Sequence, residues 1–126
     1  MARILLAEDE VAVSAFVARA LGHAGHQVTS APDGLAAVAA LAAERFDLLL
    51  SDIVMPGLDG IALALKAGKD YPAMKILLMS GYASERQRAH NLDALAHRIV
   101  AKPFTLAEIC AAVAETLEGG SARPAK

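Results

Sequence analysis

Several common kinds of site are excluded by what this chain of 126 residues lacks. Its single cysteine, Cys110, excludes an internal disulfide, a cysteine-based zinc finger and a CxxC redox motif. Tryptophan is absent, and no apolar run approaches the ~20 residues that a membrane span needs. The net charge of −2 argues against nucleic acid or an anionic membrane as the main partner. Residues 1–8 contain an acidic side chain and no long apolar core, so we expect no signal peptide and a cytoplasmic location.

The chain does contain five short apolar runs, which alternate with longer amphipathic stretches. Nearly continuous hydrophobicity is typical of strands buried on both faces of a parallel sheet. The runs cover residues 4–7, 28–31, 48–50, 76–79 and 99–101, and the predicted helices cover residues 11–24, 34–44, 60–70, 85–95 and 106–118. Right-handed crossovers fold this repeated βα order into a doubly wound α/β domain. We therefore expect one domain over residues 1–118 and a disordered tail over residues 119–126.

Short polar residues mark the starts of the predicted helices. Asp33 and Asp59, each followed by glycine, can accept hydrogen bonds from free N–H groups of the first turn. Two other helix starts match the capping box, at Ser84-x-x-Gln87 and Thr105-x-x-Glu108. In the alanine-rich stretch at residues 36–43, the apolar pattern predicts one buried helical face, formed by Leu35, Val38, Leu41 and Ala42.

Four of the five predicted strands end in polar or ionisable residues. The carboxyl ends of parallel strands share one edge of the sheet, and this is where ligands bind. The residues at these four ends are Glu8-Asp9-Glu10, Ser51-Asp52, Ser80 and Lys102. We expect carboxylates from two strands to meet a hydroxyl and an ammonium group at this edge.

This set of groups suits phosphoryl transfer with a divalent metal. Converging carboxylates repel one another unless a cation lies between them, and their hard oxygen atoms suit Mg²⁺. An aspartate can itself be the nucleophile and form an aspartyl-phosphate. A metal, an ammonium group and a hydroxyl could then each hold one phosphoryl oxygen. Each residue alone is more often a cap or a solvated turn, but their joint occurrence at four strand ends favours a functional site.

These motifs resemble the receiver domains of response regulators, over about residues 2–118. The matching segments are ILLAEDE at 4–10, DIVMPGLDG at 52–60, MSGY at 79–82 and AKPF at 101–104. The resemblance implies a flavodoxin-like fold with strand order 2-1-3-4-5. It also implies a phosphodonor, either a histidine kinase or a histidine phosphotransferase.

The resemblance further implies a role for each residue at the carboxyl edge. Asp52 would be the phosphoacceptor, Ser80 would supply the switch hydroxyl, and Lys102 would contact the phosphoryl group. The peptide bond from Lys102 to Pro103 is usually cis in this family, a conformation that only an X-Pro bond adopts at low cost. Glu8 and Asp9 would form the acidic metal pocket, in which Mg²⁺ would be held by Asp9, Asp52 and the backbone carbonyl of Val54.

Two positions depart from the usual pattern of the family. Ile99 stands where most receiver domains carry a tyrosine or phenylalanine that rotates on activation, and Glu8 stands where many carry aspartate. Glutamate keeps the charge, so metal binding should survive. Tyr82, two residues after Ser80, is our candidate for carrying the signal in place of the missing aromatic residue. Alternatively, Tyr82 only covers the core.

A closer resemblance, to the CpdR-type family of single-domain cell-cycle response regulators, rests on residues 1–9, 86–93 and 101–106. It implies phosphorylation through a histidine phosphorelay and, in the unphosphorylated form, an adaptor role for the ClpXP protease, with recruitment to a cell pole. We expect the partner face to combine the helix at residues 85–95 with the last strand and helix. Its basic residues would be Arg86, Arg88, His90 and Arg98.

Other functions compete with a phosphorylation-controlled binding module. A phosphate shuttle or a chemotaxis-type receiver would use the same site. A phosphohydrolase with an aspartate nucleophile needs a second acid two residues later, where this chain has Val54. A flavin carrier is disfavoured because Glu8-Asp9-Glu10 would repel its phosphate and no tryptophan can stack on the flavin. We expect no separate enzymatic turnover and, with about nine residues after Leu117, no DNA-binding output domain.

Overall fold

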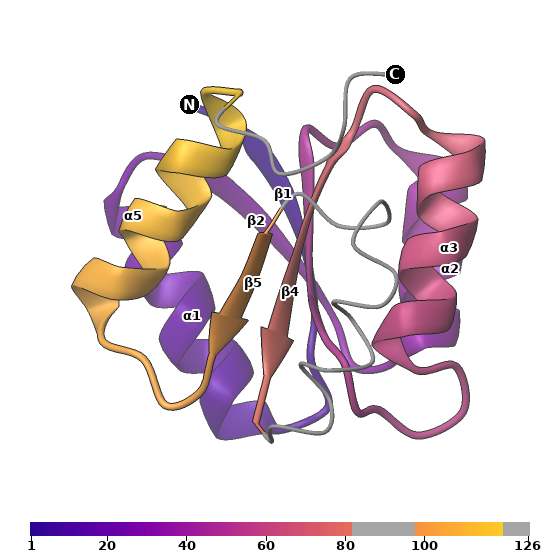
Figure 1. Cartoon of the computed structure of the whole chain (residues 1–126), viewed down its shortest axis with the longest axis horizontal. Coiled ribbons are helices and arrows are strands. Elements are labelled where there is room, and N and C mark those ends of the chain that lie inside the picture. Colours follow the sequence, from indigo (N-terminus) through magenta and orange to yellow (C-terminus); the bar gives the residue numbers. More distant parts are fainter. Residues whose placement is uncertain (82–97, 120–126) are drawn as a thin grey trace.

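A computed structural model describes residues 1–81 and 98–119 of the chain. Five strands form one parallel sheet in the order β2-β1-β3-β4-β5 (Figure 1). The elements are β1 (Arg3–Ala7), α1 (Val11–His23), β2 (Gln27–Ala31), α2 (Gly34–Ala43), β3 (Leu48–Asp52), α3 (Gly60–Asp70), β4 (Lys75–Ser80), β5 (Arg98–Ala101) and α5 (Leu106–Leu117). The predicted fold class and strand order are therefore confirmed. The predicted helix at 85–95 and residues 120–126 of the predicted tail lie outside the described residues.

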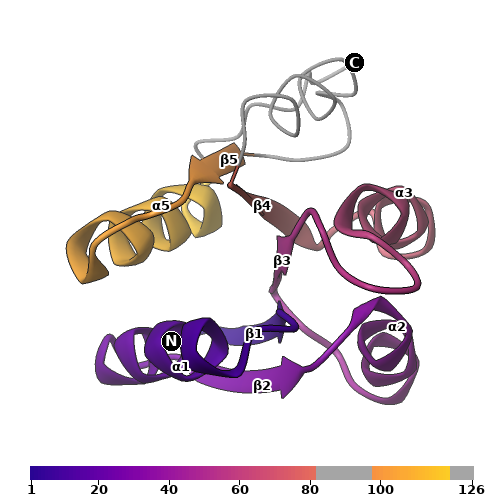
Figure 2. The ribbon, with the colours of Figure 1, turned by 90° about the horizontal axis from the view of Figure 1, so that it is seen from below.

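The sheet separates two layers of helices. Figure 2 shows α1 and α5 on one face and α2 and α3 on the other. Alternate residues of each strand enter opposite cores: Ile4 and Leu6 pack toward α1 and α5, whereas Leu5 packs toward α2 and α3. Both sets are fully buried. Burial on both faces explains why the strands read as unbroken apolar runs in the sequence.

The predicted helix caps are present at the described helix starts. Asp33 accepts a hydrogen bond from the Ala36 amide at 2.8 Å. Asp59 accepts one from the Ala62 amide at 2.9 Å. At the start of α5, Thr105 and Glu108 form a complete capping box, with each side chain bonded to the other residue's amide. These bonds satisfy backbone donors that would otherwise lack partners. The box predicted at residues 84–87 lies outside the described residues.

Two glycines allow α2 and α3 to begin in close contact with the loop after β3. A Cβ atom at Gly34 would lie 2.2 Å from the carbonyl oxygen of Leu58. One at Gly60 would lie 2.0 Å from the carbonyl oxygen of Asp52. Since real Cβ atoms do not come this close to backbone, only glycine fits at either position. The capping aspartates thus precede glycines that are required for packing, and α3 is seated directly on the end of β3.

The prediction for the buried face of α2 is confirmed for Leu41, which is buried, and for Val38, which is half-buried against the core, but it is wrong for Leu35 and Ala42. Leu35, expected in the core, is 67% exposed. The buried residues of this helix are Gly34, Ala37 and Leu41. At its start the helix turns Gly34 and Ala37 inward, and Gly34 lies too close to the Leu58 carbonyl for a larger residue. In a stretch of nearly uniform alanine, the few larger residues indicated the buried face only in part.

Within residues 1–81 and 98–119, no helix combines the length and the hydrophobicity that crossing a bilayer would require.

Candidate functional site

Three carboxylates converge where β1 and β3 end. Carboxylate oxygens of Glu8, Asp9 and Asp52 all lie within 4.8 Å of one another. Glu8 and Asp52 are buried, with 2% and 6% of their surface exposed, whereas Asp9 faces solvent. β1 and β3 are adjacent in the sheet, so the two strand ends bring these residues together across more than 40 positions of sequence, as predicted.

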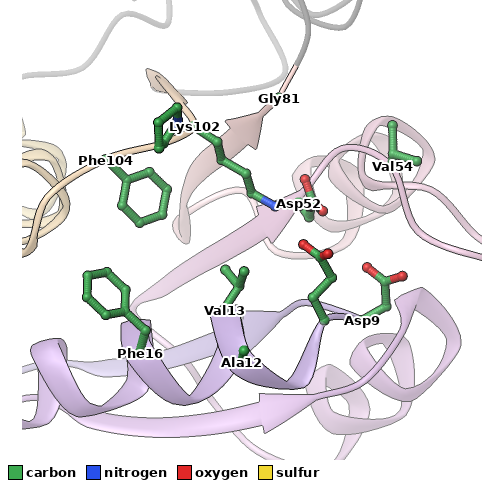
Figure 3. A pocket seen from close by; sticks show the side chains of 11 residues that line it. Asp9, Ala12, Val13, Phe16, Asp52, Val54, Gly81, Lys102 and Phe104 are labelled. Carbon is green, nitrogen blue, oxygen red and sulfur yellow. Dashed lines mark hydrogen bonds and ion pairs between the residues drawn. The ribbon is translucent and has the colours of Figure 1, made fainter.

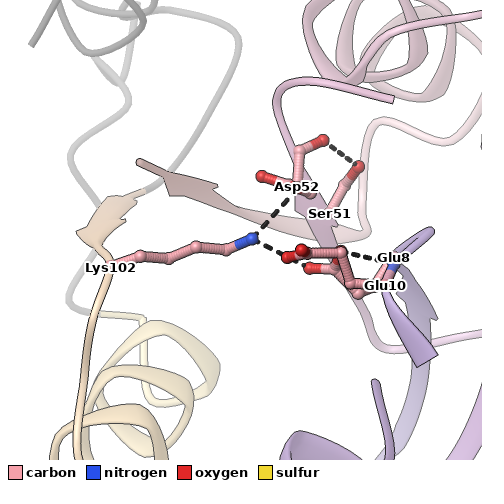
Figure 4. A network of polar contacts seen from close by, with 5 residues as sticks. All are labelled: Glu8, Glu10, Ser51, Asp52 and Lys102. Carbon is pink, nitrogen blue, oxygen red and sulfur yellow. Dashed lines mark hydrogen bonds and ion pairs between the residues drawn. The ribbon is translucent and has the colours of Figure 1, made fainter. Parts of the chain in front are cut away.

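Lys102 connects two of these carboxylates. Its Nζ atom lies 3.1 Å from an oxygen of Glu8 and 3.0 Å from Oδ2 of Asp52 (Figure 4). The backbone amide of Lys102 donates to the carbonyl of Ser80 at 2.7 Å, which fixes the start of the loop after β5. The bond from Lys102 to Pro103 is cis, as expected. The lysine side chain therefore reaches from the end of β5, at one edge of the sheet, to the ends of β1 and β3.

Hydrogen bonds also orient Glu8 and Asp52. The amide of Glu10 donates to the second oxygen of Glu8 at 3.0 Å, so both oxygens of this carboxylate have partners. The hydroxyl of Ser51 donates to the backbone carbonyl of Asp52 at 2.9 Å. Because Gly60 packs against the same carbonyl, the Asp52 peptide is held from two sides.

The site carries more negative charge than its one lysine can balance. Burial raises the pKa of Asp52, although the hydrogen bond from Lys102 partly opposes this effect. Burial likewise raises the pKa of Glu8, against the hydrogen bonds from Glu10 and Lys102. For Lys102, burial alone would lower the pKa, but the hydrogen bonds to Asp52 and Glu8 outweigh it and the pKa is raised. The structure thus favours an added cation beside these carboxylates.

The donor set fits a magnesium ion. Mg²⁺ is bound through one or two carboxylates while keeping several water ligands. Asp9 is exposed and Asp52 lies at the pocket floor, so both can present oxygen atoms to an ion from neighbouring strands. The side chain of Val54 lines the same pocket and is 52% exposed. The assignment of its backbone carbonyl as a ligand stays a prediction.

The remaining predicted residues are placed less completely. Ser80 is fully buried at the end of β4, next to Ala101 of β5. Ile99 is half-buried and packs against the core formed with α2 and α3. Arg98 begins β5, and nothing further is described for its side chain. The predicted switch and partner residues that lie outside the described residues are Tyr82, Arg86, Arg88 and His90.

One half of the pocket was missed by the sequence analysis. The cavity beside Asp52 has a volume of about 710 Å³. Its second half is lined by apolar residues, chiefly Val13 and Phe16 of α1 and Phe104 after β5 (Figure 3). The spacing of Val13 and Phe16 was a usable signal, because residues three apart share one face of a helix. Their position beside Asp52 depends on how α1 packs on the sheet, which the sequence did not show.

Similarity to known proteins agrees with this geometry. The model of the response regulator receiver domain matches residues 4–114. The response regulator receiver protein CpdR of Brucella abortus is 43% identical over 112 residues, which cover 86% of this chain and 91% of that protein. The transcriptional regulatory protein TcrA of Mycobacterium tuberculosis is 34% identical over 109 residues, but this chain covers only 43% of its length.

Solved structures share the fold. A CheY-like receiver domain protein from Methanospirillum hungatei superposes with a TM-score of 0.86 at 31% identity, covering 93% of this chain and 94% of that one. The response regulator TrrA from Thermotoga maritima, in complex with Mg²⁺ and BeF, gives 0.84 at 28% identity, with 92% and 99% covered. Since the family model spans most of the chain and the acidic pocket and lysine occupy its carboxyl edge, this chain belongs to the response regulator receiver domain family.

Proposed function

We propose that the protein is a response regulator in which Asp52 accepts a phosphoryl group in a Mg²⁺-dependent reaction. The observation that carries the proposal is the contact of one lysine with two of three converging carboxylates. The donor would be a phosphohistidine on a histidine kinase or a histidine phosphotransferase. An Asp52 oxygen forms the new bond to phosphorus, and the bond from phosphorus to the donor nitrogen breaks with its electron pair. The protein regulates rather than turning over a separate substrate.

Each residue of the site has a distinct task in this scheme. Asp9 and Asp52, with the carbonyl of Val54, would hold Mg²⁺, which when bound withdraws negative charge from the phosphoryl oxygens. Lys102 would exchange its contact with the Asp52 carboxylate for one with a phosphoryl oxygen, while Glu8 keeps the ammonium group in place. The Ser80 hydroxyl would move toward another phosphoryl oxygen and so report the modification.

Exposed apolar residues around the site support a protein as the natural donor. Most of the exposed large apolar side chains of the described residues lie on elements that meet the carboxyl edge of the sheet. They are Val11, Phe16, Leu35, Val54 and Leu106. A partner protein can cover this apolar rim while the partner's phosphohistidine reaches the pocket.

The test of this proposal is direct labelling. Incubation with acetyl phosphate and Mg²⁺ should add one acid-labile phosphate per chain, measured by intact-protein mass spectrometry. Chelation of the metal should prevent it. Labelling of equal extent after chelation would rule out the Mg²⁺-dependent reaction.

Asp9 should contribute more to Mg²⁺ affinity than Glu8. Both oxygens of Glu8 already accept hydrogen bonds, whereas Asp9 is exposed and is the proposed direct ligand. We expect Asp9→Ala to weaken Mg²⁺ binding about tenfold or more, and Glu8→Ala to weaken it less. Calorimetric titration of both variants measures this difference. Binding by Asp9→Ala that equals the wild type would remove Asp9 from the metal site.

We further propose that the unphosphorylated form is a CpdR-like adaptor that delivers substrates to ClpXP and follows it to a cell pole. The similarity to CpdR supports this role. The partner face would combine residues 85–95 with β5 and α5, including Arg86, Arg88, His90 and Arg98, and Tyr82 would transmit the signal from the site.

A phosphate shuttle and an adaptor respond differently to the loss of Asp52. We expect Asp52→Ala, which stays unphosphorylated, to bind the unfoldase component ClpX as tightly as the unphosphorylated wild type. Phosphorylated wild type should bind at least about tenfold more weakly. Pull-down or interferometry with purified ClpX measures both affinities. Equal affinity of the two wild-type forms, or no binding by any form, would favour a shuttle or a chemotaxis-type receiver.

A further inference from the structure

The cavity beside Asp52 is larger than a phosphoryl group requires. Its volume of about 710 Å³ falls in the range of small-molecule sites. One end holds Asp9, Asp52 and Lys102, and the other end is apolar (Figure 3). A phosphoryl group with its metal and lysine contacts would occupy only the charged end.

Side chains at the apolar end of the cavity are packed against the protein core. Val13 and Phe104 are half-buried and pack against the core between the sheet, α1 and α5. Phe16 lies one helical turn beyond Val13 and is 41% exposed. In Figure 3 the rings of Phe16 and Phe104 lie at the same end of the pocket, with Val13 beside them. The cavity therefore offers an anionic ligand a place for an uncharged, apolar group next to the reacting atoms.

We propose that this apolar end binds the acyl group of a small-molecule phosphodonor, and that the protein prefers branched or aromatic acyl phosphates to acetyl phosphate. The inference rests on the proposed phosphorylation of Asp52. In the reaction an Asp52 oxygen bonds to phosphorus. The bond from phosphorus to the acyl oxygen breaks, and its electron pair leaves with the carboxylate. No oxidant or further reactant is needed.

The lining also predicts which acyl groups are rejected. Ala12, Val13, Phe16 and Phe104 carry no charge that could pair with a second carboxylate on the donor. Glu10 and Asp9 line the same cavity and would repel one, and the ammonium group of Lys102 is already paired with Glu8 and Asp52. A succinyl group is close in size to a branched acyl group, but its free carboxylate would lose water without gaining a partner. Apolar donors should therefore react faster than charged donors of similar size.

The test compares four donors at equal, subsaturating concentration with saturating Mg²⁺. The donors are acetyl, isobutyryl, benzoyl and succinyl phosphate, and intact-protein mass spectrometry gives the second-order rate constant of phosphorylation. Burial of the two additional methyl carbons of isobutyryl phosphate corresponds to about a tenfold increase over acetyl phosphate. Benzoyl phosphate should react at least as fast, and succinyl phosphate no faster than acetyl phosphate.

Variants assign the preference to the apolar end. In Phe16→Ala the ratio of isobutyryl to acetyl rate constants should fall to about two or less, and in Phe16→Leu it should largely recover. Leu65→Ala removes a similarly exposed apolar side chain from α3 and should keep the wild-type ratio. Equal rates for acetyl and isobutyryl phosphate, or an unchanged ratio in Phe16→Ala, would overturn the inference but leave the phosphorylation of Asp52 standing. Failure of all four donors to label the protein would instead count against the proposed function.

Discussion

Asp52→Ala is expected to abolish phosphorylation by every donor. The variant removes the proposed nucleophile, and the two carboxylates that cluster with it in the structure have other roles. Both oxygens of Glu8 are occupied by Lys102 and the Glu10 amide, and Asp9 belongs to the metal site in our scheme. We expect the rate of phosphate incorporation to fall by at least about 1,000-fold, to below detection. Intact-protein mass spectrometry after incubation with acetyl phosphate and Mg²⁺ measures it.

A matched control is available at the end of α3. Asp70 is an exposed aspartate in a surface ion pair with Lys66, and Asp70→Ala should be labelled like the wild type. Labelling of Asp52→Ala at the wild-type rate would show that another residue is the phosphoacceptor.

Loss of labelling in Asp52→Ala should not result from unfolding. Burial raises the pKa of Asp52 above its ordinary value, which means that the folded protein disfavours the charged carboxylate. The stability that this group contributes is therefore greatest below the pKa that it has in the unfolded chain. It is lost as the pH rises through the pKa that it has in the folded protein. At pH 7 without Mg²⁺, Asp52→Ala should therefore unfold at a temperature equal to or above that of the wild type. The carboxylate is retained for its chemistry at a cost in stability.

The sequence was sufficient for the parts of this molecule that depend on local patterns. Unbroken apolar runs predicted the strands, and Asp33, Asp59 and Thr105 predicted three helix starts, because a cap is decided within one turn. The meeting of Asp9, Asp52 and Lys102 followed from the rule that parallel strands end at one edge. These predictions need no knowledge of how the helices lie on the sheet.

What the sequence did not show depends on that packing. The apolar end of the pocket requires Phe16 and Phe104 to lie together, and this depends on how α1 sits beside the loop after β5. On α2, Leu41 and Val38 lie on the buried face as predicted, but Leu35 is exposed and Gly34 is buried beside the loop after β3, a contact that the apolar pattern did not show. The sequence likewise did not show that position 60 requires glycine, since a glycine directly after a capping residue is common.

The second large effect is expected at Gly60. A Cβ atom there would lie 2.0 Å from the carbonyl oxygen of Asp52 and 2.8 Å from the Cα atom of Ile53. Both atoms are backbone, and the Gly60 amide also donates to the Ile53 carbonyl at 2.7 Å, so neither side can move away without breaking the junction. We expect Gly60→Ala to lower the free energy of unfolding by about 3 kcal/mol. It should also slow phosphorylation of Asp52, because the displaced backbone carries the nucleophile.

Gly68 provides the control within the same helix. A Cβ atom there would meet only the end of the Ile76 side chain, at an ordinary 3.8 Å. Alanine forms helix better than glycine, so Gly68→Ala should be neutral or stabilise the protein by up to about 1 kcal/mol. Urea unfolding of both variants separates the effect of close packing from that of helix propensity. If Gly60→Ala proved as stable as Gly68→Ala, the start of α3 could not be seated on the Asp52 carbonyl. The proposed link between this helix and the phosphoacceptor would then be lost.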